Sequence, residues 1–140
     1  MVKSFRHACV QVKNLDSSTR FYRDVLGLRV SKVLRLEGWY PEALFNIKGV
    51  KLEYVKMHAP GQGKMSPPVF ELHCWKRPRI KNLPSMGHVS FTVKDAGSMY
   101  KKLKKAKARV ISRPVKAPDS GCMFFFAKDP DGNLIEFVQD

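Results

Sequence analysis

Hydrophobic and polar positions along the 140-residue chain follow two different periods. Alternation with a period of two predicts a β-strand, and apolar residues three or four positions apart predict an amphipathic helix. Alternating segments predict strands over residues 5–13, 28–36, 50–57, 69–75, 88–93, 108–113, 122–127 and 133–138. Helical spacing predicts one helix that ends before Gly27, another over residues 96–107, and a short helical turn over residues 42–47. The order of elements is β-α-β-β-β, twice.

Polar residues and glycines mark the ends of these elements. Asp16 or Ser17 is suited to cap the first helix at its N-terminus, and Asp95 is suited to cap the second. Gly27 provides a C-terminal stop for the first helix. The segment Asp129-Pro130-Asp131-Gly132 combines an early proline with a final glycine, which predicts a tight turn between the last two strands.

The two halves of the chain share a pattern of residues. When the second half is laid over the first at a shift of 81 residues, His7 meets His88. The identities continue into the helix, with the pairs Val12 and Val93, Lys13 and Lys94, and Ser17 and Ser98. Each half also ends on a strand with a glutamate between apolar residues, Phe70-Glu71-Leu72 and Ile135-Glu136-Phe137. The sequence therefore predicts a duplicated module with one histidine and one glutamate in each copy.

A single module of this kind cannot bury all of its apolar surface, because one helix cannot cover both faces of a four-stranded sheet. Pairing two modules edge to edge predicts an α+β fold: two tandem βαβββ modules form a curved mixed sheet around a cavity, with the helices outside. A chain of 140 residues has room for one such domain. We expect a single domain over residues 1–140, with module one over 1–75, a linker over 76–86 and module two over 87–140.

The alternation of side chains along each strand predicts which residues face the cavity. They are His7, Cys9, Gln11, Glu71, His73, Trp75, His88, Ser90, Thr92, Leu134, Glu136 and Val138. Two imidazoles and two carboxylates in one cavity would suit a divalent transition metal such as Zn, Ni, Co, Mn or Fe, with positions left open for water or substrate. The predicted ligands are His7, Glu71, His88 and Glu136.

One predicted ligand has an alternative, because Leu52-Glu53-Tyr54 also places a glutamate between apolar residues. If Glu53 lay on the last strand of module one, the strand over residues 69–75 would be supernumerary. With Glu71 as the ligand, each module has four strands. We therefore expect Glu71 to be the ligand and keep Glu53 as the alternative. His73 shares the face of Glu71 and is expected to line the cavity.

The composition is that of a globular protein, with 44% hydrophobic residues. No apolar run approaches the roughly 20 residues that span a bilayer, and the N-terminus has no apolar leader, so we expect a cytoplasmic protein without membrane association. The three cysteines are odd in number and form no CxxC pair, which disfavours a zinc ribbon or a disulfide framework. They are expected to be reduced and mostly buried.

The formal net charge of +14 is the most unusual feature of the composition. The densest basic run, residues 101–107, has Met99, Leu103 and Ala106 at helical spacing beneath it, so the run is expected to be the solvated face of a helix. A basic surface also suits an anionic small-molecule substrate. Nucleic acid is not an expected partner, because no helix-turn-helix, aromatic RNA-binding segment or zinc-finger spacing is present.

Three segments together resemble the vicinal oxygen chelate superfamily, which includes glyoxalases, bleomycin-resistance proteins and extradiol dioxygenases. They are His7 to Leu28, Gly87-His88-Val89-Ser90-Phe91, and Phe124 to Glu136. The resemblance implies one divalent metal, bound by histidine or glutamate from the first and last strand of each module, and a homodimer. It also implies that Glu136 or Glu71 acts as the catalytic base.

The resemblance favours a metal-dependent lyase or isomerase of the lactoylglutathione lyase type, which binds two neighbouring oxygens of a small substrate and stabilises an enediolate. An epimerase of a coenzyme A thioester and an extradiol dioxygenase are alternatives within the superfamily. A metal-free protein that binds a drug or another small ligand is an alternative of a different class. Stoichiometric metal in the purified protein would separate the enzymes from that binding protein.

Overall fold

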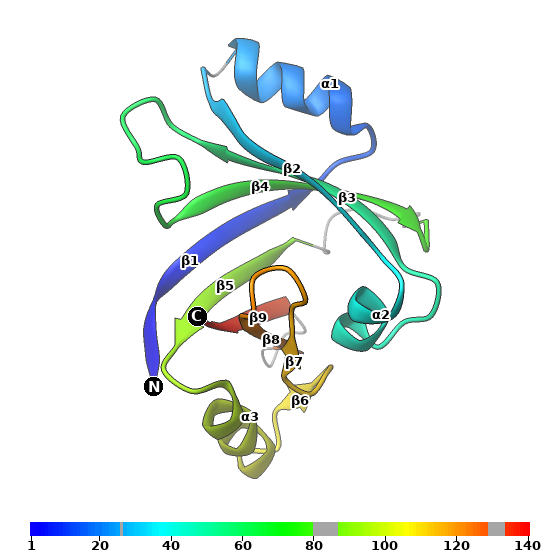
Figure 1. The fold of residues 1–140 in the computed structure, drawn as a ribbon, viewed down its shortest axis with the longest axis vertical. Helices are drawn as coiled ribbons and strands as arrows, with labels where there is room; N and C mark the ends of the chain where they lie inside the picture. The colour runs from blue at the N-terminus through cyan, green and yellow to red at the C-terminus, as the bar shows by residue number, and fades with distance from the viewer. Residues whose placement is uncertain (26, 80–86, 129–133) are drawn as a thin grey trace.

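A computed structural model describes residues 1–25, 27–79, 87–128 and 134–140. Within these ranges the chain forms one nine-stranded mixed sheet with three α-helices, as Figure 1 shows. The strands are β1 (Val2–Gln11), β2 (Arg29–Glu37), β3 (Lys51–His58), β4 (Val69–Arg77), β5 (His88–Val93), β6 (Arg109–Val110), β7 (Val115–Lys116), β8 (Met123–Lys128) and β9 (Leu134–Gln139). The helices are α1 (Leu15–Arg20), which continues as a wider π-helical turn η1 (Phe21–Val25), α2 (Trp39–Phe45) and α3 (Ala96–Lys105).

The strand order shows the duplication directly. The order is β2-β3-β4-β1-β5-β9-β8-β6, with β7 paired to β8. In each half the first strand pairs in parallel with the last, β1 with β4 and β5 with β9. The two halves meet through β1 and β5, which pair antiparallel. The predicted α+β fold, with two modules in one curved mixed sheet, is therefore confirmed.

The predicted strands of the first half are observed with small shifts at their ends, whereas the second half departs more from the prediction. The strand expected over 108–113 is reduced to the two residues of β6, and β7 follows as a separate short strand. The turn expected at 129–132 and residues 80–86 of the expected linker lie outside the described residues. The part of the expected linker that is described begins within β4, which runs to Arg77.

The capping of the helices agrees with the prediction only in the second module. Asp95 accepts a hydrogen bond from the backbone N–H of Ser98 and caps α3 as expected. The prediction of Asp16 or Ser17 for the first helix is wrong, because the side-chain oxygen of Asn14 accepts the bond from the backbone N–H of Ser17 at 2.9 Å. Asparagine is as good an N-cap as aspartate or serine, so residue type alone does not select among Asn14, Asp16 and Ser17.

Each module packs an outer helix against its own half of the sheet. Leu15 of α1 packs with Val55, Leu72 and Cys74, and Ala96 and Met99 of α3 pack with β8 and β9. Lysines 101, 102, 104 and 105 are exposed along α3, as expected for a solvated face. Ala106 is also exposed, so the apolar stripe of α3 is shorter than predicted. Among the described residues, no helix has the length and apolar character needed to cross a bilayer.

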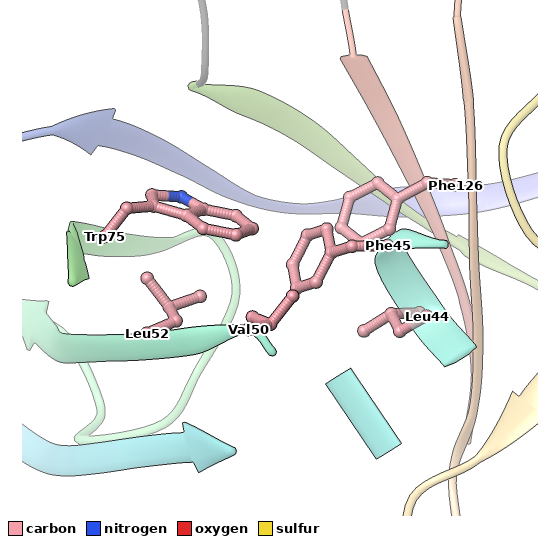
Figure 2. Close-up of a cluster of buried hydrophobic side chains, with 6 residues drawn as sticks. All are labelled: Leu44, Phe45, Val50, Leu52, Trp75 and Phe126. Carbon is pink, nitrogen blue, oxygen red and sulfur yellow. The ribbon is translucent and has the colours of Figure 1, made fainter. Parts of the chain in front are cut away.

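Helix α2 lies on the cavity side, where its apolar residues join the two modules. Figure 2 shows Leu44 and Phe45 of α2 beside Trp75 of β4 and Phe126 of β8. The Phe45 ring stacks on Phe126 with centroids 5.1 Å apart, and it meets Trp75 edge to face at 4.7 Å. Because such pairs bury large rings from both halves, they help to fix the position of one module against the other. Trp39, in contrast, is 63% exposed.

Candidate metal centre

The four predicted ligands lie on four neighbouring strands at the centre of the sheet, in the order β4, β1, β5 and β9. Glu71 is on β4, His7 on β1, His88 on β5 and Glu136 on β9. All four side chains are buried. Their strand neighbours Phe70, Leu72, Ile135 and Phe137 pack toward the outer helices, which is why alternation turns the ligands inward.

Nitrogen and oxygen atoms of His7, His88 and Glu136 converge on one point, and Glu71 lies by the other ring nitrogen of His7. His7 Nε2 lies 2.5 Å from His88 Nε2 and 3.1 Å from Glu136 Oε2. His88 Nε2 lies 3.6 Å from the same carboxylate oxygen. Glu71 approaches from the opposite side, with Oε1 3.6 Å from His7 Nδ1. His7, Glu71 and His88 each offer a ligand atom within 4.8 Å of the others.

A glycine allows the two modules to approach closely at this point. Gly87 precedes His88, and a Cβ at residue 87 would lie 2.6 Å from the carbonyl oxygen of Cys9 on β1. Only glycine fits this contact without movement of the backbone. The close approach also places the backbone N–H of His88 in a hydrogen bond to Cys9 Sγ, 3.3 Å away.

The two carboxylates are oriented by different neighbours. The Ser90 hydroxyl donates to Glu136 Oε2 at 2.8 Å. Glu71 instead accepts a hydrogen bond from His73 Nε2 at 2.8 Å, and Lys56 Nζ lies 3.5 Å from its other oxygen. Each carboxylate therefore keeps a fixed orientation in a buried setting, where an unpaired charge would be costly.

Both carboxylates are ionised because cationic groups outweigh their burial. Burial by itself raises the pKa of Glu71, but the hydrogen bond from His73 and the charges of His7 and Lys56 lower that pKa to about 2. Burial acts in the same way on Glu136, yet His7 and His88 hold its pKa well below the usual range. Glu71 thus has a lysine among its partners, whereas the groups that lower the pKa of Glu136 are the two histidines.

Cys9 lies between two of the histidines. Its Sγ is 3.2 Å from His88 Nδ1, and it also hydrogen-bonds with His73. Burial raises the pKa of the thiol, but these two imidazoles outweigh burial and lower the pKa to about 6. Burial lowers the pKa values of His73 and His88, whereas hydrogen bonds to Cys9 and to a glutamate raise both above the ordinary value.

The ligands form part of the wall of a cavity of about 230 Å³. Three cationic side chains, Arg6, Lys32 and Lys56, line the same cavity, together with the acidic Asp119. Tyr54 also lines it, and burial raises the pKa of its phenol, so the hydroxyl stays protonated and is able to donate a hydrogen bond.

The donor set fits a divalent transition metal. Imidazole nitrogen and carboxylate oxygen suit Zn, Ni, Co, Mn and Fe. An octahedral ion with bonds of about 2.1 Å separates adjacent donors by about 3 Å. The separations among His7 Nε2, His88 Nε2 and Glu136 Oε2 run from 2.5 to 3.6 Å and bracket that value. The structure thus brings all four predicted ligands together, and their role in binding metal stays a prediction.

Glu53, the alternative ligand, lies away from the cavity. Its strand neighbours Leu52 and Tyr54 line the cavity, so Glu53 points to the other face of β3. There its carboxylate lies 3.5 Å from Arg35 and 3.6 Å from Lys76. Trp75, which the alternation predicted to face the cavity, is not among the described residues that line it and belongs to the apolar cluster that joins the modules.

Sequence reasoning missed the roles of Lys56 and Cys9. Lys56 reaches Glu71 across the β3–β4 pair, where the two residues are direct partners in register. Cys9 was expected on the cavity side as a reduced, buried thiol without a role at the site, although the internal repeat aligns it with Ser90, the partner of Glu136. The alignment of Cys9 with Ser90 was the signal that the residue two positions after each histidine contacts the site.

Comparison with known proteins identifies the family of the chain. The family model of the Glyoxalase/Bleomycin resistance protein/Dioxygenase superfamily matches residues 4–137. The chain belongs to this superfamily. It is 31% identical to a lactoylglutathione lyase from Neisseria meningitidis serogroup A over 135 residues, which cover 95% of this chain and 88% of the relative. It is 33% identical to the mitochondrial methylmalonyl-CoA epimerase of Mus musculus over 136 residues, with coverage of 95% and 71%.

Solved structures share the glyoxalase fold. A methylmalonyl-CoA epimerase from Streptomyces coelicolor in complex with 2-nitronate-propionyl-CoA superimposes with a TM-score of 0.68. The alignment covers 100% of this chain and 99% of the epimerase at 18% sequence identity. At that identity the similarity establishes the fold, and it leaves the reaction to be argued from the site itself.

Proposed function

We propose that this protein is a metal-dependent lyase or isomerase of the glyoxalase type, acting on a small substrate with two neighbouring oxygens. One observation carries the proposal. Two imidazoles and two carboxylates, drawn equally from two modules, converge in the wall of a cavity large enough for a small molecule. The lactoylglutathione lyases at about 30% identity support the same chemistry.

In this proposal His7, His88, Glu71 and Glu136 hold the ion. A divalent metal in that position supplies a Lewis acid that stabilises negative charge developing on the two substrate oxygens. The two histidines contribute neutral nitrogen donors. Cys9 Sγ and His88 Nδ1 are hydrogen-bond partners at 3.2 Å, so Nε2 is the nitrogen left to face the ion.

Glu136 is the better candidate for the catalytic base. Glu71 is held by His73 and Lys56, and those partners keep it ionised as a fixed ligand. Within the described residues no lysine or arginine forms an ion pair with Glu136, whose neighbours are the two histidines and the Ser90 hydroxyl. Once both histidines serve as neutral ligands, the ion would be the positive charge beside Glu136, and the carboxylate would have to release the ion to act as a base. It then takes the proton from the carbon beside the substrate carbonyl and returns it to the neighbouring carbon.

The substrate is expected to carry an anionic group. Arg6, Lys32 and Lys56 outnumber Asp119 among the charged residues of the cavity wall outside the ligand cluster. A carboxylate or phosphate on the non-reacting part of the substrate would be attracted to this side, while the apolar wall would contact its carbon chain.

Turnover by metal-loaded protein tests the proposal. The protein is stripped with a chelator and reloaded with Ni²⁺, Co²⁺, Mn²⁺, Zn²⁺ or Fe²⁺. Its turnover is then followed as the formation of lactoylglutathione, the compound for which the relatives are named. We expect turnover that depends on metal and is lost in Glu136→Gln while circular dichroism stays unchanged. Normal turnover by Glu136→Gln, or by the stripped protein, would refute the assignment.

Epimerisation of a coenzyme A thioester is the second candidate. The 33% identity to the mouse epimerase favours it, and it requires the same removal of a proton beside a carbonyl. The two candidates separate when the loaded protein is offered methylmalonyl-CoA in deuterated water. Incorporation of deuterium at the carbon between the carbonyls, with no formation of lactoylglutathione, would select the epimerase.

The superfamily resemblance also supports a homodimer. Light scattering of the purified protein tests this, with a mass of about twice 16.0 kDa expected for the dimer.

A further inference from the structure

We propose that Cys9, His73 and His88 form a second metal position, selective for thiophilic ions such as Zn²⁺, Cd²⁺ and Co²⁺, beside the four predicted ligands. Atoms of these three residues lie within 4.8 Å of one another, and all three side chains are buried. The proposal concerns ion binding alone, and its count of two ions per chain rests on the four-ligand centre proposed above.

The His88 ring is placed between the two positions. Its Nε2 faces His7 and Glu136, at 2.5 and 3.6 Å. Its Nδ1, on the opposite side of the ring, lies 3.2 Å from Cys9 Sγ. One imidazole therefore presents a different nitrogen to each position, and with both positions filled His88 would bridge the two ions as an imidazolate, its ring proton having passed to solvent.

His73 is arranged in a similar way. Its Nε2 is bound to Glu71 Oε2 at 2.8 Å, and the ring also hydrogen-bonds with Cys9. The rings of His73 and His88 are 5.2 Å apart and meet at a steep angle of 68°. The sulfur thus lies where two imidazoles from different modules approach it, and no chain movement is needed to gather the three donors.

The separation of the donor atoms suits a tetrahedral ion. Bonds of about 2.3 Å to sulfur and about 2.0 Å to nitrogen at a tetrahedral angle place the two donors roughly 3.5 Å apart. The observed distance of 3.2 Å between Cys9 Sγ and His88 Nδ1 is close to this value. Three protein donors leave a fourth corner for water or for a further ligand.

The two positions differ in donor chemistry. The four predicted ligands offer only nitrogen and oxygen, which suit Mn²⁺ and Fe²⁺ as well as softer ions. The second position includes a thiolate, which selects zinc and other thiophilic ions against manganese. The burial of Cys9, at 6% exposure, also keeps its sulfur from other partners in solution.

Titration of chelator-treated protein with Co²⁺ tests the proposal, because a thiolate ligand gives cobalt an intense ultraviolet charge-transfer band. We expect saturation at two ions per chain, with the band arising from one of them. Cys9→Ser should bind one ion and lose the band. Saturation of the wild type without the band, or persistence of the band in Cys9→Ser, would overturn the proposal, whereas a single ion that gives the band would count against the four-ligand centre instead.

Cys122→Ser is the matched control. Cys122 is a half-exposed thiol that also lines the cavity, and it is outside the cluster of Cys9, His73 and His88. This variant should keep both ions and the full band. Loss of the band in Cys122→Ser would assign the thiolate signal to the wrong cysteine and would overturn the proposal.

A measurement on the unaltered protein removes any dependence on how the variants fold. X-ray absorption at the zinc edge is measured on wild-type protein loaded with two ions per chain. It should detect an average of one sulfur neighbour for every two zinc ions. A first coordination sphere of nitrogen and oxygen alone would contradict a second position that includes Cys9. Loading with Mn²⁺ should reach one ion per chain, and two bound Mn²⁺ ions would contradict the predicted selectivity.

Discussion

The two halves of the candidate metal centre have the same backbone arrangement and different surroundings. In each module the histidine strand pairs in parallel with the glutamate strand, and the residue two positions after the histidine is in register with the glutamate. In module two that residue is Ser90, which donates to Glu136. In module one it is Cys9, whose sulfur contacts His88, and other residues hold Glu71.

The partners of Glu71 come from module-specific residues. His73 lies two positions after Glu71, and Lys56 reaches it from the adjacent strand β3. The position two after Glu136 is Val138, which offers no polar group. A duplicated scaffold thus fixes where the two glutamates lie, and in our proposal a few neighbouring substitutions decide which carboxylate is a fixed ligand and which is free to accept a proton.

The largest expected effect comes from exchanging the two carboxylates for amides. Glu136→Gln should lower kcat by about 10²–10⁴-fold, the usual contribution of a positioned base, while the protein still binds metal. Glu71→Gln should retain most of kcat at saturating metal, because an amide oxygen still coordinates. Steady-state kinetics on both variants, with metal content measured in parallel, check the difference. Equal losses of kcat would remove the distinction between the two modules.

His73→Gln should weaken metal binding through Glu71. The substitution removes the 2.8 Å hydrogen bond that orients this carboxylate. Loss of such a supporting partner typically lowers metal affinity by about 10–100-fold. Competition with a coloured chelator measures the affinity, and kcat at saturating Mn²⁺ should change less than the affinity does. An unchanged affinity would mean that Lys56 alone suffices to hold Glu71.

Metal affinity should rise with pH, by about tenfold per pH unit for each proton displaced. Hydrogen bonds to Cys9 and Glu136 outweigh burial and raise the pKa of His88, so between its ordinary value of about 6.5 and the raised value the metal-free protein carries a proton that the ion must displace. The two carboxylates have lowered pKa values and are already ionised in that range.

In the metal-free protein, the contribution of His88 to stability should fall as pH rises. A raised pKa of His88 in the folded state contributes stability that is complete below about pH 6.5 and is lost as pH rises through the raised pKa. The lowered pKa of Cys9, about 6, contributes stability of the opposite sign above that pH, so thermal unfolding is measured on Cys9→Ser with and without metal. A metal-free Cys9→Ser protein whose stability increases with pH through that window would contradict a protonated His88.

The smallest effect is expected from Ser90→Ala. The variant loses the hydroxyl that donates to Glu136 at 2.8 Å. A hydrogen bond of about 1 kcal/mol corresponds to roughly a fivefold change, which should be seen in kcat with metal affinity nearly unchanged. The corresponding residue in module one, Cys9, contacts histidines instead of a glutamate. Its substitution should therefore affect ion binding.

Much of the fold could be predicted from the sequence, because period-two alternation and the internal repeat are local signals. The same alternation predicted the inward direction of Glu71 and Glu136 from their apolar neighbours. The approach of His88 to Cys9 could not be predicted in this way. These residues are 79 positions apart, and they meet only because β1 and β5 pair and Gly87 permits the contact.

The residue that caps the first helix could not be predicted, because several nearby residues are equally suited to the role. Asn14, Asp16 and Ser17 are all good helix caps, and only the geometry of α1 selects Asn14. The reach of Lys56 to Glu71 depends on the register of β3 with β4, which the chain segment between them does not reveal. Interactions of this kind depend on tertiary contacts, which no local pattern encodes.

The central claim is that two modules hold one ion between four side chains. Anomalous X-ray diffraction from crystals of the wild-type protein loaded with Mn²⁺ tests it most directly, because Mn²⁺ avoids the thiolate position. The account predicts a single anomalous peak within bonding distance of side chains from both modules: His7, Glu71, His88 and Glu136. A protein that takes up no Mn²⁺, or a peak that contacts the residues of one module only, would contradict it.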